Sequence, residues 1–157
     1  MTTVWLQRIL VLGWIPTLFL LGGMTWFQGQ SAVAQTRTPI TVTRIYTGGD
    51  GKTHAEEYDL SLNQPRGATE MADSIAVTNV QFRRTSPDYF IDWHTAPRKQ
   101  FVITLSGESE IEIGNGTTIR LHPGHILLAE DVTGQGHISR AVGSEDRISL
   151  FLPLADQ

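Results

Sequence analysis

Histidines and carboxylates are the side chains of this sequence that could do chemistry. The five histidines are His54, His94, His122, His125 and His137. No two of them form a tight pair such as H-x-H or H-x-x-x-H, so no local metal motif is complete. The sequence has no cysteine, no G-x-S-x-G run and no P-loop, which argues against nucleophilic catalysis and phosphate-loop chemistry. General acid–base chemistry and metal binding remain.

One acidic pair stands in a position suited to such chemistry. Glu130-Asp131 directly follows an apolar run and precedes a glycine-rich loop that leads to His137. Carboxylates at a strand end beside a histidine can be metal ligands, general bases or loop caps, and we expect the catalytic acids to be Glu130 and Asp131. Glu110 and Glu112 alternate with isoleucines, which is typical of a solvated sheet face.

The elements that must position these residues are short β-prone runs separated by Gly- or Pro-containing turns. Runs of this length and spacing predict an all-β sandwich or small barrel, and no sustained helical stripe occurs. One helical turn could form at 68–74. The expected strands are 41–46, 57–62, 75–83, 101–105, 110–113, 117–121, 126–129 and 148–152.

The N-terminal segment differs from the rest of the chain. Residues 9–27 carry no charge, Arg8 precedes them, and Ser31-Ala32-Val33-Ala34 follows. This pattern predicts a signal peptide at 1–34 and an exported domain at 35–157, periplasmic or secreted. The alternative is an uncleaved membrane anchor with the domain facing the periplasm, since about 19 apolar residues can span a bilayer.

Length and charge limit the remaining classes. The chain has 157 residues, 40 % of them apolar, and a net charge of −4. These values suit one domain with a core and argue against a nucleic-acid partner.

Two segments resemble the motifs of the cupin superfamily. The run D-W-H-T-A-P-R-K-Q-F-V-I-T-L-S-G, from Asp92 to Gly107, is similar to the first motif, and the segment from Pro123 to His137 is similar to the second. The strings W-H-x-A-P-R and L-L-A-E-D-x-x-G-x-G-H resemble those of small single-domain bacterial cupins. The resemblance covers about residues 75–152 and implies an all-β cupin barrel, a double-stranded β-helix or jelly roll, which often holds a divalent metal.

The resemblance also implies a ligand set. His94 matches the first histidine of the first motif, Ala96 stands at the second, and Gln100 stands at the glutamate. His137 matches the histidine of the second motif, and Ala141 stands at that motif's final asparagine. The expected metal ligands are therefore His94, His137 and Gln100, for Fe, Mn, Ni or Zn. A third strong donor could also come from Asp131, Glu130 or, if the N-terminal strand folds over the barrel mouth, His54.

A ligand pocket is expected inside this barrel. If Gln100 points inward, the two-residue period of a strand also turns Val102 and Thr104 inward. We add Trp93, Arg98 and His54 as pocket residues, whereas His122 and His125 flank a Pro-Gly turn and are expected at the surface.

The same period turns three large apolar side chains outward, Phe101, Ile103 and Leu105. Such side chains need a cover, so we expect a homodimer through the outer sheet.

Two functions stay open at this point. The first is an exported small-molecule cupin, with or without enzymatic activity, in which His94 and His137 hold a metal and an acid accepts a proton. The second is a metal-free ligand-binding module of the cell envelope that holds a polar small molecule through His94, Gln100 and Arg98. A fold of this kind does not select a substrate.

Overall fold

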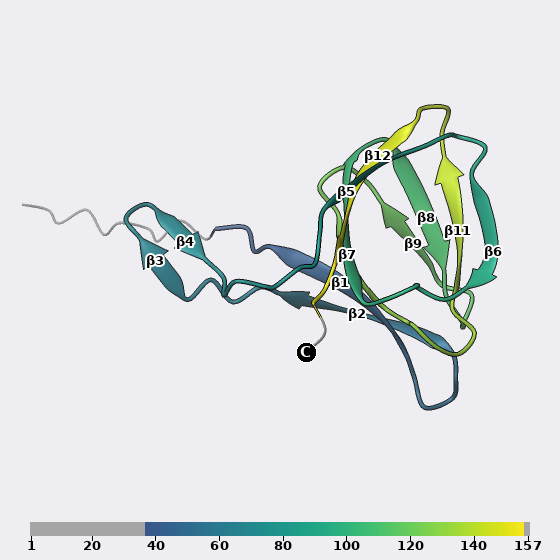
Figure 1. Ribbon diagram of the computed structural model, residues 1–157, viewed down its shortest axis with the longest axis horizontal. Helices are drawn as coiled ribbons and strands as arrows, with labels where there is room; N and C mark the ends of the chain where they lie inside the picture. Colours follow the sequence, from purple (N-terminus) through teal and green to yellow (C-terminus); the bar gives the residue numbers. More distant parts are fainter. Residues whose placement is uncertain (1–36, 156–157) are drawn as a thin grey trace, which may run out of the picture. The chain divides into compact units, whose positions relative to one another are not determined.

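The computed structural model describes residues 37–155, and this part of the chain is all-β without a helix (Figure 1). The all-β prediction is therefore confirmed for this part. The leader predicted at 1–34 lies outside the described residues. Among the described residues, no helix is long and apolar enough to cross a membrane.

The strands of the described region are short and follow one another through tight turns. They are β1 (Thr41–Thr47), β2 (Thr53–Asp59), β3 (Gln64–Arg66), β4 (Thr69–Met71), β5 (Gln81–Thr85), β6 (Phe90–His94), β7 (Gln100–Ser106), β8 (Glu108–Glu112), β9 (Thr118–Leu121), β10 (Ile126–Glu130), β11 (His137–Val142) and β12 (Arg147–Pro153).

Two sheets enclose the interior (Figure 1). The larger has the order β2-β1-β10-β7-β12-β5, and the smaller has the order β6-β11-β8-β9. Neighbouring strands are antiparallel except β1 and β10, which run parallel. A separate hairpin pairs β3 with β4.

The core lies between the two sheets, because alternate residues of each strand point inward. Ile111 and Ile113 are buried, whereas Glu110 and Glu112 on the other face of β8 form ion pairs with Arg140. The solvated-face prediction for these glutamates is therefore confirmed. The larger sheet contributes Ile45, Val102, Leu127 and Ala129 to the same cluster, and β9 contributes Leu121.

Three local predictions are wrong. The strand expected at 57–62 lies earlier, at Thr53–Asp59. The strand expected at 75–83 begins only at Gln81, and Val77 makes a single bridge to Leu154 instead of a ladder. The helical turn expected at 68–74 is the strand β4 of a hairpin. Gly67 has a φ of 62° in the hairpin turn, a conformation that suits a reversal of the chain and not a helix.

The alternation expected for the strand at 101–105 is present in β7. Gln100, Val102 and Thr104 are buried, whereas Leu105 is 45 % exposed. On the edge strand β5, which pairs with β12, Phe82 lies opposite Leu150 and is 73 % exposed. The outer face of the larger sheet therefore carries apolar side chains that the described residues leave open to solvent.

The homodimer stays a prediction, and Phe82 allows a test that spares the core. We expect wild-type protein to sediment as a dimer at micromolar concentration and Phe82→Glu to sediment as a monomer, because a charge in an apolar interface is unpaired there. Phe90→Glu, on the edge strand of the smaller sheet and 60 % exposed, is the matched control. A wild-type protein that sediments only as monomer would contradict the prediction.

Candidate functional site

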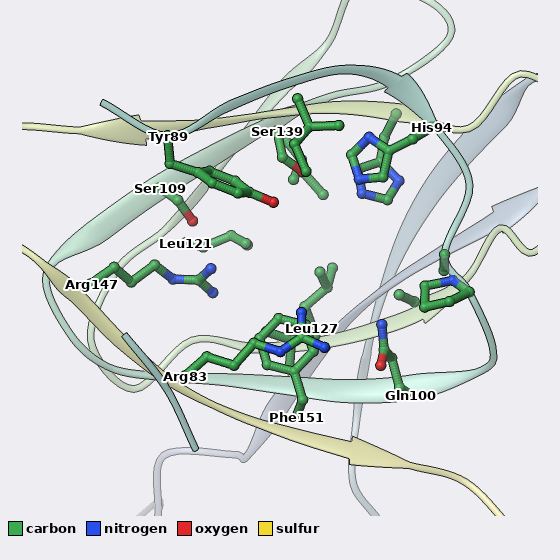
Figure 2. Close-up of a pocket in the computed structure, with 17 residues that line it drawn as sticks. Arg83, Tyr89, His94, Gln100, Ser109, Leu121, Leu127, Ser139, Arg147 and Phe151 are labelled. Atoms are coloured by element: carbon green, nitrogen blue, oxygen red, sulfur yellow. The ribbon is translucent and has the colours of Figure 1, made fainter. Parts of the chain in front are cut away.

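A cavity of about 180 Å³ lies between the two sheets (Figure 2). Seventeen residues line it, and none of them is an aspartate or glutamate. Its apolar lining includes Leu121, Leu127 and Phe151, and Leu127 and Phe151 lie between Arg147 and Gln100 in Figure 2. The residues of the lining that carry polar side-chain atoms are Arg83, Tyr89, His94, Gln100, Ser109, His137, Ser139 and Arg147.

The two histidines of the cupin-like motifs meet in this cavity. His94 ends β6 and His137 begins β11, and the two residues are paired across the ladder. Their ring centroids are 4.5 Å apart with an angle of 53° between the planes. The fold thus brings together two histidines that lie 43 positions apart in the sequence.

Both imidazoles are fixed through Nδ1. His94 Nδ1 lies 2.9 Å from the backbone carbonyl oxygen of Asp92, and His137 Nδ1 lies 2.6 Å from Asp131 Oδ2. A carbonyl oxygen and a carboxylate only accept hydrogen bonds, so Nδ1 donates in each case. Each neutral ring therefore carries its lone pair on Nε2, the nitrogen left for a ligand.

Asp131 is the fixed point behind His137. Its side chain is fully buried, and its Oδ2 also accepts a hydrogen bond of 3.2 Å from Thr53 Oγ1 on β2. Asp131 does not line the cavity. The expectation that Asp131 acts directly as a catalytic acid near the mouth is not met by this placement, because the carboxylate is covered by the histidine that it orients.

A β-bulge aims His94 into the cavity. From His137 to Ser139 the strand β11 advances two residues, while β6 advances three, from His94 back to Ile91. The extra residue changes the phase of β6, so that both Ile91 and His94 line the cavity. Bulges re-aim side chains in this way.

Gly136 lets the preceding loop approach closely enough to bring His137 beside His94. Its φ is 73°, and a Cβ at this position would lie 2.0 Å from the carbonyl oxygen of His94. No other residue type fits this contact without displacement of the backbone.

The donor set does not fit a divalent first-row ion. Such an ion takes at least three good protein ligands, but only His94 and His137 are strong donors here, and the carboxylate of Asp131 faces Nδ1 of His137. No group of three His, Asp or Glu side chains in the described part of the chain could hold a metal ion. Gln100 adds only a neutral amide. The metal stays a prediction.

A guanidinium lies away from the histidines, across the labelled part of the cavity (Figure 2). Arg147 begins β12 and is only 7 % exposed. Its Nε and Nη2 contact Thr104 Oγ1 at 3.3 and 2.9 Å. Burial lowers the pKa of Arg147 from its usual value, although a guanidinium remains charged in proteins.

Tyr89 and Ser109 lie near Arg147 in the same view (Figure 2). The hydroxyl of Tyr89 points into the cavity, and burial raises the pKa of this phenol. Ser109 is 4 % exposed, and its Oγ has no hydrogen-bond partner in the structure. This end of the cavity therefore holds a guanidinium and two hydroxyls, and no carboxylate.

Two of the expected pocket residues line the cavity. Gln100 and Val102 do so from β7. Thr104, on the same inward face, is occupied by the hydrogen bonds of Arg147 and supports that side chain instead of lining the cavity.

Four expected site residues lie elsewhere. Glu130 is bound by Arg44 Nε at 2.6 Å and Lys99 Nζ at 3.4 Å on the outer side of β10, because it alternates with the inward Ala129. Arg98 lines a separate hollow of about 610 Å³ with Glu130. Neither residue lines the cavity.

His54 and Trp93 also lie outside the cavity. His54 Nε2 lies 2.9 Å from Asp50 Oδ1, and its ring stacks on Tyr46. That contact holds His54 on the β1–β2 hairpin instead of over the barrel mouth. Trp93 is 39 % exposed because it falls in the bulge of β6.

The turn histidines differ from each other. His122 is exposed, as expected, whereas His125 is half-buried and burial lowers its pKa. The surface expectation is wrong for His125.

Sequence reasoning missed the cationic end of the cavity. Arg147, Tyr89, Arg83 and Ser109 carry no motif. The one available signal was parity, since Arg147 and the inward Phe151 are four residues apart on one strand.

The chain is similar to several solved structures. No protein family and no curated protein matches the chain. Similar solved structures include a cupin 2 conserved barrel domain protein from Salinispora arenicola, with 14 % identity and a TM-score of 0.40 over 62 % of this chain and 82 % of that chain.

A conserved protein of unknown function from Streptococcus pyogenes has 22 % identity and a TM-score of 0.39 over 50 % of this chain and 65 % of that chain, which is less than two thirds of its length. A protein from Neisseria meningitidis has 14 % identity and a TM-score of 0.39 over 56 % and 90 % of the two chains. Likeness at this level assigns no activity.

The hydrogen bonds at Nδ1 predict the tautomers of the two cavity histidines. Nitrogen-15 NMR of the neutral imidazoles should show the Nδ1–H form for both His94 and His137. His54, which contacts Asp50 through Nε2, is the internal control and should show Nε2–H. In Asp131→Ala, His137 should become a mixture of tautomers while His94 keeps Nδ1–H; an unchanged His137 would contradict the role of Asp131.

The ion pairs of Glu130 predict an acid-dependent part of the stability. Burial alone would raise the pKa of Glu130, but Arg44 and Lys99 outweigh burial and hold it below its ordinary value of 4.5. The stabilisation is therefore complete above pH 4.5 and is lost as the pH falls through the lower folded-state pKa.

Glu130→Gln should lower the free energy of unfolding by about 1 kcal/mol at neutral pH and flatten its decline in acid. Urea unfolding at a series of pH values measures both effects. The exposed Glu145→Gln is the control, and identical acid profiles for Glu130→Gln and wild type would contradict the prediction.

Proposed function

We propose that this chain is a small cupin-type barrel that binds a small polar molecule in the cavity between its two sheets, with His94 and His137 as the recognition groups. The observation that carries the proposal is the fixed orientation of both rings. The acceptors at Asp92 and Asp131 hold each Nδ1–H, so each Nε2 is left as an acceptor for a ligand hydroxyl.

The shape and lining of the cavity support a small ligand. At about 180 Å³ it is below the roughly 300–1,000 Å³ that drug-sized ligands occupy. An apolar middle with a few fixed polar groups is the usual construction of a binding site. Because the leader predicts export, the expected setting is the cell envelope or the medium.

Butanediol is a suitable first probe, because it has an apolar chain and a hydroxyl at each end. We expect it to shift the imidazole nitrogen-15 signals of His94 and His137 with millimolar affinity, the range for a ligand of few atoms, and to leave His54 unchanged. Val102→Phe, which fills the cavity, should abolish the shifts. Ile103→Phe is the matched control, because the next residue of β7 points to the opposite face.

Two results would overturn the proposal. One is the absence of any shift of the cavity histidines in folded wild-type protein. The other is stoichiometric Fe, Mn, Ni or Zn in the purified protein that is lost in the His94→Ala/His137→Ala double variant, since the metal-dependent function expected from the cupin resemblance would then hold.

A further inference from the structure

Arg147 is a buried cation without an anion. Among residues 37–155, no carboxylate lies within 4.0 Å of its guanidinium, whereas Arg44, Arg120 and Arg140 all form ion pairs on the outer surface. A buried charge is costly unless it is paired and hydrogen-bonded. The uncharged Thr104 is its only hydrogen-bond partner in the described structure.

The guanidinium has donors to spare. Arginine carries five N–H groups in a planar fork, and only those of Nε and Nη2 reach Thr104. Nη1 makes no hydrogen bond to the described residues. Since Arg147 lines the cavity, the remaining donors are available to a molecule inside it.

Three neighbours of Arg147 also offer hydrogen-bond donors or positive charge to an anion in the cavity. Ser109 Oγ is buried without a partner, and the Tyr89 hydroxyl points into the cavity beside Arg147 (Figure 2). A second cation, Arg83, also lines the cavity, with its guanidinium 3.8 Å from the ring centroid of Phe151. No acid balances these groups inside the cavity.

We infer that the ligand of the proposed binding function is a short hydroxycarboxylic acid, whose carboxylate binds at Arg147 with Ser109 and Tyr89 and whose hydroxyl donates its one proton to Nε2 of either His94 or His137. The inference rests on the proposed function and adds the charge and class of the ligand. The apolar middle formed by Leu127 and Phe151 would hold the carbon chain between the two polar ends.

A carboxylate suits this end better than a phosphate. The fork of a guanidinium pairs in plane with two carboxylate oxygens, and Ser109 supplies one further donor. A phosphate dianion would need both guanidiniums, and that of Arg83 lies over the ring of Phe151, 3.8 Å from its centroid, whereas a carboxylate carries one charge, which Arg147 alone balances. Phosphate is therefore the competing outcome of the test.

The experiment compares charged and neutral probes on the same histidine signals. Glycolate, gamma-hydroxybutyrate and epsilon-hydroxycaproate vary the chain length, and butanediol is the neutral counterpart. We expect at least one hydroxy acid to bind about 10- to 100-fold more tightly than butanediol, the range for a hydrogen bond to a charged group.

Variants of Arg147 test whether this residue causes the tighter binding of the hydroxy acid. Arg147→Gln should bring the hydroxy acid to the affinity of butanediol, and Arg147→Lys should retain part of the difference because it keeps the charge without the fork. Arg120→Gln, which removes an exposed guanidinium from the outer face of β9, is the matched control and should bind as wild type does.

The outcomes separate the two proposals. If butanediol binds and no hydroxy acid binds more tightly, the inference is wrong and the binding function stands. If inorganic phosphate displaces butanediol more strongly than any hydroxy acid, the carboxylate assignment is wrong. If none of the probes shifts the histidine signals, both proposals fail. If Arg147→Gln does not fold, the affinities of wild-type protein for the hydroxy acids and for butanediol still decide whether the ligand is an anion.

Discussion

The buried carboxylate of Asp131 is the interaction on which the site depends. It joins Thr53 of the larger sheet to His137 of the smaller one, and its backbone oxygen accepts the N–H of Ala96 in the connection that follows β6. A fully buried carboxylate is costly unless hydrogen bonds hold it. Both side-chain hydrogen bonds go to Oδ2, and Oδ1 is buried without a partner in the structure, so the loss of either contact would leave the charge still less compensated. The orientation of His137 is thus set by the same contact that links the sheets.

The second histidine is placed by backbone geometry instead of charge. The bulge in β6 turns His94 inward, and Gly136 allows the β11 side to approach the carbonyl of His94. One ring is therefore held by a carboxylate and the other by a main-chain oxygen. Because these constraints come from different elements, the loss of Asp131 would release His137 and leave His94 in place.

Periodicity was enough to predict the all-β class and the inward face of β7, because alternation records which side chains are buried. The motif histidines His94 and His137 were also found from the sequence. The bulge could not be predicted, since an extra residue in a strand leaves no pattern, and it moved Trp93 out of the pocket. Glu130 forms an ion pair with Arg44, which lies 86 positions earlier. The spacing of residues in a sequence does not predict ion pairs between such distant positions.

The charge of the cavity lining is opposite in sign to the net charge of the chain. The chain has more acids than bases, yet the cavity lining contains two guanidiniums and no carboxylate. An isolated buried guanidinium lowers the stability of the folded state, and an anion that binds only the folded state restores it through mass action. If the inferred carboxylate binds there, Arg147 would couple the stability of the fold to its ligand, whereas a buried pair with a protein carboxylate would have stabilised the fold without any ligand.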